Sequence, residues 1–271
     1  MAVVTMLNQK GGVGKTSCTH HLAGTLAQLG RKVLLLDNDP QASLSQGFWG
    51  PVAARRIDPA ETIAALYAGD RPFPEQVIKP TGIDGIDLVA GSRHATDYNV
   101  PRPFEADFEV QTCLRTFLAE VSGQYDLVLI DCPPNLHLCS WAALVASDHL
   151  IVPLQPEDYG AQGIVDVQES VALVQGGPNP DLALLGYLIT MAAPRKTIHQ
   201  LYEERLRALY GTDVFEAKVP EAVDYVEAIA RRQPIAQYKP KSAAAKAIRA
   251  LAEELEARLK AKAHAPRTEA A

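Results

Sequence analysis

A glycine-rich stretch near the start of the chain carries the residues best suited to chemistry. Residues 9–16 read Gln-Lys-Gly-Gly-Val-Gly-Lys-Thr and follow an apolar run at residues 3–7. A strand that turns through glycines into a helix directs backbone N–H groups and the positive end of the helix dipole at an anion. Lys15 would then reach the β- and γ-phosphates of a nucleotide, and the Thr16 hydroxyl would ligate Mg²⁺.

The loop differs from the pattern G-x-x-x-x-G-K-[ST] at one position. Gln9 stands where the first glycine belongs, and a second lysine, Lys10, follows it. Lys10 cannot easily share the γ-phosphate of its own chain with Lys15. We therefore expect Lys10 to reach a nucleotide bound by another subunit.

Two more segments place carboxylates at the ends of apolar runs. Residues 34–41 read Leu-Leu-Leu-Asp-Asn-Asp-Pro-Gln and contain Asp37 and Asp39, and the apolar run at residues 127–130 ends at Asp131. Ligands of doubly wound sheets bind outside the carboxyl ends of the strands, so these acids should lie near the loop. Asp131 has the Walker B arrangement and would hold Mg²⁺.

Apolar runs without alternation are separated by amphipathic stretches, a pattern typical of strands buried on both faces. It predicts an α/β fold with a doubly wound, mostly parallel sheet flanked by helices on both faces. We expect one domain over residues 1–262 and a disordered tail at 263–271. The segments 48–56 and 93–107, rich in Pro and Arg, are expected to be surface loops. Further strands are expected at 33–37, 86–89, 127–131, 150–154 and 184–190, and helices at 16–29, 58–68, 110–121, 163–174 and 198–210.

Composition narrows the class of protein. The chain has 271 residues, 47% of them hydrophobic and 21% charged, as in ordinary globular proteins. No apolar run reaches 18 residues and no signal peptide is visible, so we expect neither a transmembrane helix nor export. The four cysteines show no C-x-x-C spacing, which fits a reducing cytoplasm. The net charge of −6 disfavours a globally basic nucleic-acid binder but leaves room for a local basic patch.

These motifs resemble the deviant Walker A ATPases, whose loop reads K-G-G-x-G-K-T and which include the ParA/Soj partition ATPases, MinD and the nitrogenase iron protein. The resemblance covers residues 2–260 or so. It implies the P-loop NTPase fold and an ATP hydrolase that uses Mg²⁺. Asp37 would lie near the Mg²⁺ shell with Thr16 and Asp131, and Asp39 would orient the attacking water. The catalytic residues would be Lys10, Lys15 and Asp39, and the nucleotide would contact Lys10, Gly11, Gly12, Val13, Gly14, Lys15, Thr16 and Ser17, with its base near Met191 and Pro220.

The resemblance also implies partners: an ATP-dependent homodimer, nonspecific DNA in the nucleoid, and a ParB-like activator. Arg195 matches a family DNA-contacting arginine, but acids at Glu221 and Asp224 weaken the other half of that surface. No membrane anchor of the MinD kind is expected. Such a helix should end in bulky apolar residues amid lysines, whereas the last helical pattern here ends in Ala-Lys-Ala-His-Ala-Pro. An N-terminal helix-turn-helix is not expected either, because eight residues precede Gln9. The DNA-binding candidates are Arg195, Arg231, Arg232 and Lys241, with Lys196, Lys239, Lys246 and Arg249 as further members of a displaced patch.

Two alternatives remain at the level of sequence. The same machine could position a cargo other than DNA, such as a chemotaxis cluster or a carboxysome. An iron-protein-type cluster carrier would need two cysteines per subunit near a dimer axis. Cys139 stands alone, and Cys18 and Cys132 have the character of small core residues, so this alternative is the weaker one.

Overall fold

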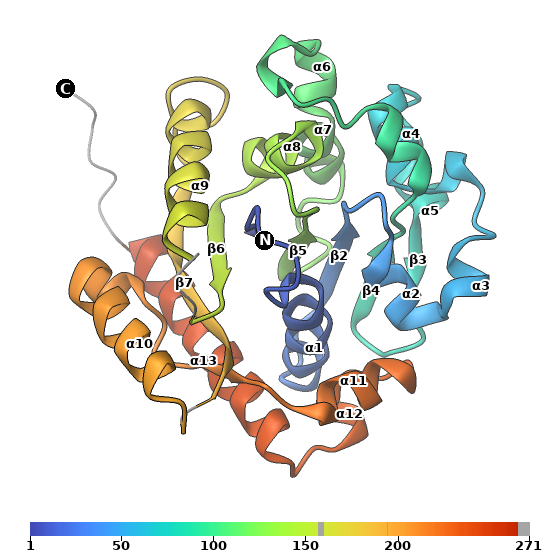
Figure 1. Ribbon diagram of the computed structural model, residues 1–271. Helices are drawn as coiled ribbons and strands as arrows, with labels where there is room; N and C mark the ends of the chain where they lie inside the picture. Colours follow the sequence, from blue (N-terminus) through green and yellow to red (C-terminus); the bar gives the residue numbers. More distant parts are fainter. Residues whose placement is uncertain (157–159, 194, 265–271) are drawn as a thin grey trace.

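The computed structural model describes residues 1–156, 160–193 and 195–264. Within them, eight strands form one sheet in the order β3-β4-β2-β5-β1-β6-β7-β8 (Figure 1). Every pairing is parallel except the antiparallel pair of β3 and β4 at one edge. The strands are β1 (Ala2–Met6), β2 (Val33–Asp37), β3 (Ile78–Pro80), β4 (Ile86–Val89), β5 (Leu127–Asp131), β6 (His149–Leu154), β7 (Ala183–Ala192) and β8 (Val219–Pro220).

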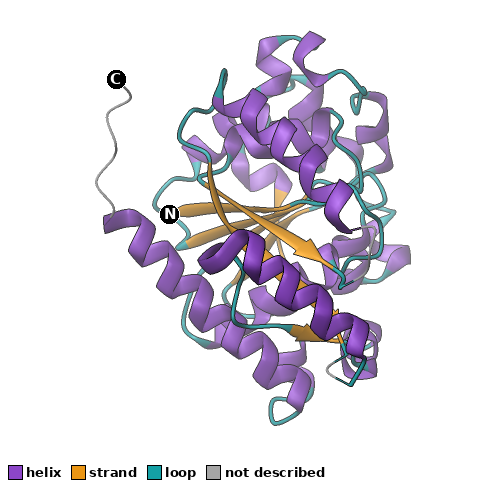
Figure 2. Ribbon diagram, turned by 60° about the vertical axis from the view of Figure 1, so that its left-hand side comes forward, coloured by secondary structure: helices purple, strands orange, loops and turns teal. Residues whose placement is uncertain are grey.

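Helices cover both faces of the sheet, and Figure 2 shows them on either side of the strands. One apolar layer contains side chains of α4 (Ile63–Ala68), α7 (Cys113–Glu120), α8 (Leu138–Ala146), α9 (Gly160–Gln175) and α10 (Thr197–Tyr210). The other contains side chains of α1 (Lys15–Gln28), α2 (Ser43–Trp49), α11 (Val223–Ala230), α12 (Ile235–Tyr238) and α13 (Ala243–His264). Short helices α3 (Pro51–Ala54), α5 (Pro74–Val77) and α6 (Phe108–Gln111) complete the described part.

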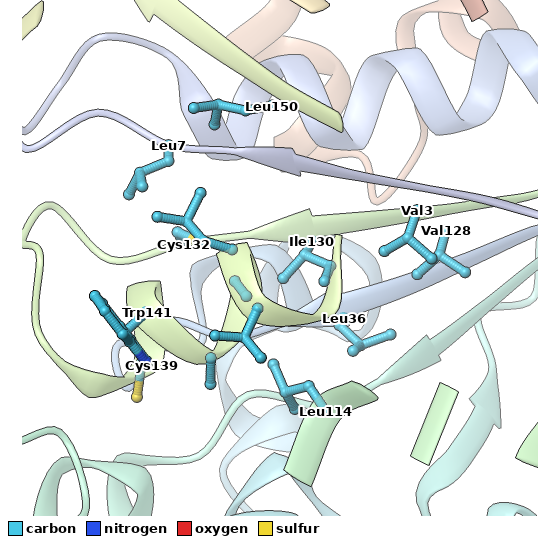
Figure 3. Packing of buried hydrophobic residues seen from close by; sticks show 14 of the residues in the cluster. Val3, Leu7, Leu36, Leu114, Val128, Ile130, Cys132, Cys139, Trp141 and Leu150 are labelled. Atoms are coloured by element: carbon cyan, nitrogen blue, oxygen red, sulfur yellow. The ribbon is translucent and has the colours of Figure 1, made fainter. Parts of the chain in front are cut away.

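The central strands are buried on both faces, as their unbroken apolar runs predict. All five residues of β2 are buried; Leu34 and Leu36 belong to the layer with α7 and α8, whereas Val33 and Leu35 belong to the layer with α1. Figure 3 shows the first layer, where Leu36 lies near Ile130 of β5 and Leu114 of α7. The expected α/β sheet with helices on both faces is therefore confirmed. No helix among the described residues is long and apolar enough to cross a membrane.

Several local predictions were wrong. The two segments expected to be surface loops are partly helical, with α2, α3 and 3₁₀ turns at Arg93–Asp97 and Pro103–Glu105. They also bury Phe48 and Ala95, because apolar side chains in short turns still pack on the sheet layers. The helix expected at 58–68 begins as a 3₁₀ turn and restarts at Ile63, because Thr62 caps a new helix.

The helix expected at 110–121 is likewise divided into α6 and α7. The final helix α13 continues to His264, so the boundary expected at 262 falls inside it. Residues 265–271, the rest of the expected tail, lie outside the described residues.

Candidate nucleotide-binding site

The glycine-rich loop connects β1, at the centre of the sheet, to α1. Gly14 precedes the helix in the left-handed conformation, with φ of 84°, and gives it no side-chain cap. Outside the regular elements, no backbone hydrogen bond of the described residues uses the N–H groups of Gly12, Val13 or Gly14. The loop thus presents free donors at a helix N-terminus, which is the backbone arrangement that binds phosphate.

Lys15 turns back over this loop. Its Nζ donates to the carbonyl oxygens of Asn8 at 2.9 Å and Lys10 at 3.1 Å, and the side chain is only 7% exposed. Burial lowers the pKa of Lys15, while the nearby carboxylate of Asp131 acts in the opposite direction. An ammonium group that is held by carbonyl oxygens alone is poorly neutralised, so a phosphate group would be a better partner.

Thr16 joins the loop to the neighbouring strand β5. Its Oγ1 donates to Oδ2 of Asp131 at 2.6 Å. The other oxygen of Asp131, Oδ1, is buried and has no hydrogen-bond partner among the residues that the structure describes. Burial, together with the charge of Asp37, raises the pKa of Asp131 well above its ordinary value.

Asp37 lies beside Asp131, since these two residues are paired in the register of β2 and β5. Its Oδ2 accepts hydrogen bonds from the backbone N–H and the Oγ of Ser45, at 2.7 and 2.6 Å, while its Oδ1 is buried and no described residue donates to it. Burial raises the pKa of Asp37 to about 7. A Cβ on Gly91 would lie 2.7 Å from the Asp37 carboxyl carbon, so only glycine fits there.

The two acids and Thr16 fit the coordination of Mg²⁺. Each acid has a buried carboxylate oxygen that no described residue donates to, and a divalent cation would stabilise the charged carboxylates that burial disfavours. The described residues contain no group of three His, Cys, Asp or Glu side chains that could hold a metal ion on their own. Mg²⁺ is bound through one or two carboxylates together with phosphate oxygens and water, and Asp37 and Asp131 could supply those carboxylates.

Asp39 lies two residues beyond the end of β2. Its Oδ1 accepts the backbone N–H of Gln41 at 2.9 Å, which orients the carboxylate, and no hydrogen bond between described residues engages Oδ2. The residue is 8% exposed, and burial raises its pKa while Lys15 opposes that shift. The structure therefore places Asp39 and Lys15 close enough for their charges to interact.

Supporting residues that sequence patterns missed lie around the loop. Asn8 is buried; its Oδ1 accepts the N–H of Lys10 at 2.8 Å, and its Nδ2 donates to the carbonyl of Pro153 at 2.7 Å. Thr190 on β7 donates to the carbonyl of Val13 at 2.8 Å. A polar residue at the end of an apolar strand, such as Asn8, was the one available signal for these contacts.

The residues expected near the base come together on neighbouring strands. Met191 in β7 and Pro220 in β8 lie at the same end of the pair, where Ala192 is opposite Pro220. Met191 has a φ of 51°, and its sulfur contacts Nε2 of Gln155, which also reaches the carbonyl of Gly12 at 3.5 Å. This surface thus adjoins the phosphate loop. Ser17, in the first turn of α1, is partly exposed.

The DNA-binding candidates have different surroundings. Arg195, Arg231 and Lys241 are exposed, whereas the guanidinium of Arg232 donates to the carbonyl oxygens of Gln46 and Ile229, at 3.1 and 3.2 Å. Among the further basic residues, two are paired with acids: Lys239 with Asp224 and Glu227, and Arg249 with Glu253.

The thiols lie inside the subunit. Cys18, Cys132 and Cys139 are buried and free, and burial raises their pKa values. Cys132 and Cys139 lie in the apolar layer shown in Figure 3. Such thiols suit packing and are poorly placed to bridge a cluster between two subunits.

Comparison with known proteins agrees with this site. A family model described as an AAA domain matches residues 1–184. The chain is 37% identical over 256 residues to the chromosome-partitioning ATPase Soj of Thermus thermophilus, covering 94% of this chain and 96% of the relative. It is 35% identical over 254 residues to the chromosome partitioning protein ParA of Myxococcus xanthus, covering 93% and 87%.

Solved structures give the same fold. Cobyrinic acid a,c-diamide synthase from Mycobacterium smegmatis, with bound ATP analogue and magnesium, matches with a TM-score of 0.80 and 27% identity over 97% of both chains. The cell division ATPase MinD of Pyrococcus furiosus matches with a TM-score of 0.71 and 26% identity, covering 94% of this chain and 98% of that one. By sequence and by fold, the chain belongs to the ParA/Soj family of partition ATPases, within the deviant Walker A group.

Proposed function

We propose that this protein is a Mg²⁺-dependent ATPase that alternates between a monomer and an ATP-bound dimer, and that the dimer binds DNA nonspecifically to position or segregate it. The observation that carries the proposal is the under-neutralised charge at the carboxyl end of the central strands. Among the described residues, Lys15 Nζ donates only to carbonyl oxygens, and two buried acids each have an oxygen that accepts no hydrogen bond. Mg²⁺ and a nucleoside triphosphate together would neutralise all three groups.

In this proposal the loop binds ATP through residues 10–17. The free backbone N–H groups at the start of α1 hold phosphate oxygens, and Lys15 exchanges its carbonyl partners for the β- and γ-phosphates. Met191 and Pro220 form part of the surface for the base. Relatives of the same fold support this assignment, since solved structures of them hold an ATP analogue or ADP with magnesium.

Thr16, Asp131 and Asp37 would hold Mg²⁺, which would supply positive charge to neutralise the charge that develops in phosphoryl transfer. Asp131 fixes the Thr16 hydroxyl by their 2.6 Å hydrogen bond. Asp37 is fixed in turn by Ser45, which also accepts the N–H of Gly91 at 2.9 Å. The site is thus oriented by contacts between the end of β2, the segment that follows β4, and α2.

Hydrolysis needs a group that orients water in line with the γ-phosphate. Asp39 has one oxygen fixed by Gln41 and the other not engaged by the described residues, so it can accept a hydrogen bond from that water. We assign Lys15 the role of neutralising the transferred phosphoryl group, and Lys10 the same role across the dimer.

The proposed partners follow from the relatives. Their names, chromosome partitioning protein ParA and chromosome-partitioning ATPase Soj, favour DNA as the cargo, the nucleoid as the place of work and a ParB-like activator. One ATPase domain, expected over residues 1–262, would perform ATP binding, dimerisation, DNA binding and hydrolysis.

Light scattering and DNA binding by the purified protein test the proposal together. With ATP and Mg²⁺ the protein should form a dimer that binds unrelated duplexes equally, and with ADP or EDTA it should be monomeric and bind DNA weakly. A monomer in all conditions, or DNA binding that ignores the nucleotide, would contradict it. Stimulated phosphate release on adding a ParB-like protein encoded beside this gene would extend it to the activator.

A further inference from the structure

A cleft of about 770 Å³ lies next to the segment that carries Asp39. Its lining includes residues 40–43, which directly follow Asp39, and Gly91, which packs against Asp37. Three exposed arginines also line it: Arg55 and Arg56 after α3, and Arg93 after β4. Segments far apart in the sequence thus bring guanidinium groups to one hollow beside the proposed active site.

These three guanidinium groups make no ion pair within the part of the chain that the structure describes. Other arginines do, such as Arg31 with Glu256 at 2.6 Å and Arg258 with Glu254 at 2.8 Å. The cleft lining contains one carboxylate, Asp58, whose Oδ1 accepts the N–H of Ala60. The cleft is therefore locally positive in a chain whose net charge is −6.

The positive surface continues beyond the cleft. Gln46 of α2 lines the cleft, and its carbonyl oxygen accepts from Nη1 of Arg232 at 3.1 Å. A Cβ on Gly50 would lie 3.2 Å from Nε of Arg232, so this side chain packs on the turn between α2 and α3. Arg231, which precedes it, is exposed. We call Arg55, Arg56, Arg93, Arg231 and Arg232 the arginine strip.

We propose that the arginine strip binds the phosphate backbone of double-stranded DNA. The inference rests on the proposed DNA-binding function, and it locates that binding on the α2–α3 side of the molecule instead of the surface near Arg195. Guanidinium groups match phosphate in a bidentate geometry, and several that form no ion pair with the described residues suit a polymer that repeats this group.

Specific binding of an acidic protein to this cleft would require more than complementary charge. Specific protein interfaces centre on buried aromatic and apolar anchors, and the cleft lining contains no Phe, Tyr or Trp. Backbone contacts to DNA require only well-placed cations and polar groups, which Gln41, Gln46 and Ser92 add to the arginines. The strip therefore favours DNA over an acidic polypeptide.

The test compares the double variant Arg55→Gln/Arg56→Gln and the single variant Arg93→Gln with the wild type. Arg205→Gln on α10 is the matched control, since Arg205 is exposed and makes no ion pair among the described residues. Fluorescence anisotropy with a labelled duplex, ATP and Mg²⁺ would be measured over a range of salt concentrations. The double variant should bind about tenfold more weakly, and the slope of its affinity against salt should fall by about two phosphate contacts.

Nucleotide affinity and ATP-dependent dimerisation are measured on the same samples, so that a disturbed active site is recognised. If the wild type binds DNA and the double variant binds it with unchanged affinity and salt slope, the strip is not the DNA surface and the proposed function stands. If the wild type binds no DNA with ATP at low salt, the proposed function fails and the inference fails with it. Polyglutamate that displaces the duplex at equal charge concentration would overturn the choice of DNA.

Discussion

The nucleotide-binding end of the molecule and the surface around α11 differ in how their charged side chains are neutralised. At the ends of β2 and β5, Asp37 and Asp131 are buried, and each has an oxygen that accepts no hydrogen bond within the described part of the chain. Around α11, Lys239 is paired with both Asp224 and Glu227 at 2.7 and 2.6 Å. Buried charges without a partner indicate a site for a ligand. Charges that already form ion pairs do not require a ligand to neutralise them.

Removing the lysine of the nucleotide end should have the largest effect. Lys15→Ala removes the lysine that would neutralise the β- and γ-phosphates within the same subunit, so nucleotide binding should be lost in a fluorescent-nucleotide titration. Lys32→Ala, which changes an exposed lysine at the other end of β2, is the control and should bind as the wild type does. Retained affinity in Lys15→Ala would mean that the loop is not the phosphate site.

Asp39→Ala should separate binding from turnover. The carboxylate is expected to orient water and to contribute little to ground-state affinity, so phosphate release should fall by about tenfold or more while ATP still induces dimers. Steady-state phosphate release and light scattering measure the two properties. Wild-type hydrolysis in the variant would remove Asp39 from the mechanism.

The two regions meet along α1, where a buried histidine connects them. Nδ1 of His21 accepts the N–H of Ile235 at 3.0 Å, and burial lowers the pKa of His21 to about 4. Between this pKa and its unfolded value near 6.5 the unfolded chain binds more protons, so this contribution to stability falls as pH decreases.

Urea unfolding at pH 7.0 and pH 5.5 measures that contribution. The wild type should lose about 1 kcal/mol more than His21→Gln between the two pH values. His94→Gln, at an exposed position, should behave as the wild type does. Equal losses in the wild type and His21→Gln would contradict the shifted pKa.

A smaller effect is expected from removing the ion pairs of the surface around α11. In Asp224→Asn/Glu227→Gln, Lys239 loses both acid partners and a free cation appears beside Arg231. DNA affinity should then rise by about threefold, since exposed ion pairs contribute less than about 1 kcal/mol. Anisotropy at two salt concentrations measures the change, and an unaltered affinity would show that this surface lies away from the DNA.

Sequence patterns predicted the parts of the fold that depend on local composition. The bounds of β2, β4 and β5 agree with the prediction because unbroken apolar runs end at charged or turn residues. The edge strands β3 and β8 were missed because each is short and contains a proline, which weakens strand patterns.

The candidate site likewise has one part that sequence motifs predict and another that depends on tertiary structure. The loop and the acids at strand ends were visible as motifs, whereas the bond from Asn8 to Pro153 joins residues 145 positions apart. The contact of Ser45 with Asp37 and the packing of Gly91 on that acid also depend on tertiary structure, and no local spacing encodes them. Arg55, Arg56 and Arg93 lie in segments that the sequence predicted to be loops, and only the fold places them on one cleft. Arg231 and Arg232 were already DNA-binding candidates in the sequence.

The central claim is that ATP induces dimerisation and that Lys10 acts across the dimer interface on the nucleotide of the other subunit. Light scattering of Asp39→Ala and of Asp39→Ala/Lys10→Ala, each with ATP and Mg²⁺, tests it most directly because hydrolysis is suppressed in both. We predict a dimer for the single variant and a monomer for the double variant, with measurable nucleotide affinity in both. Dimers of both proteins, or loss of nucleotide binding with Lys10, would contradict the claim.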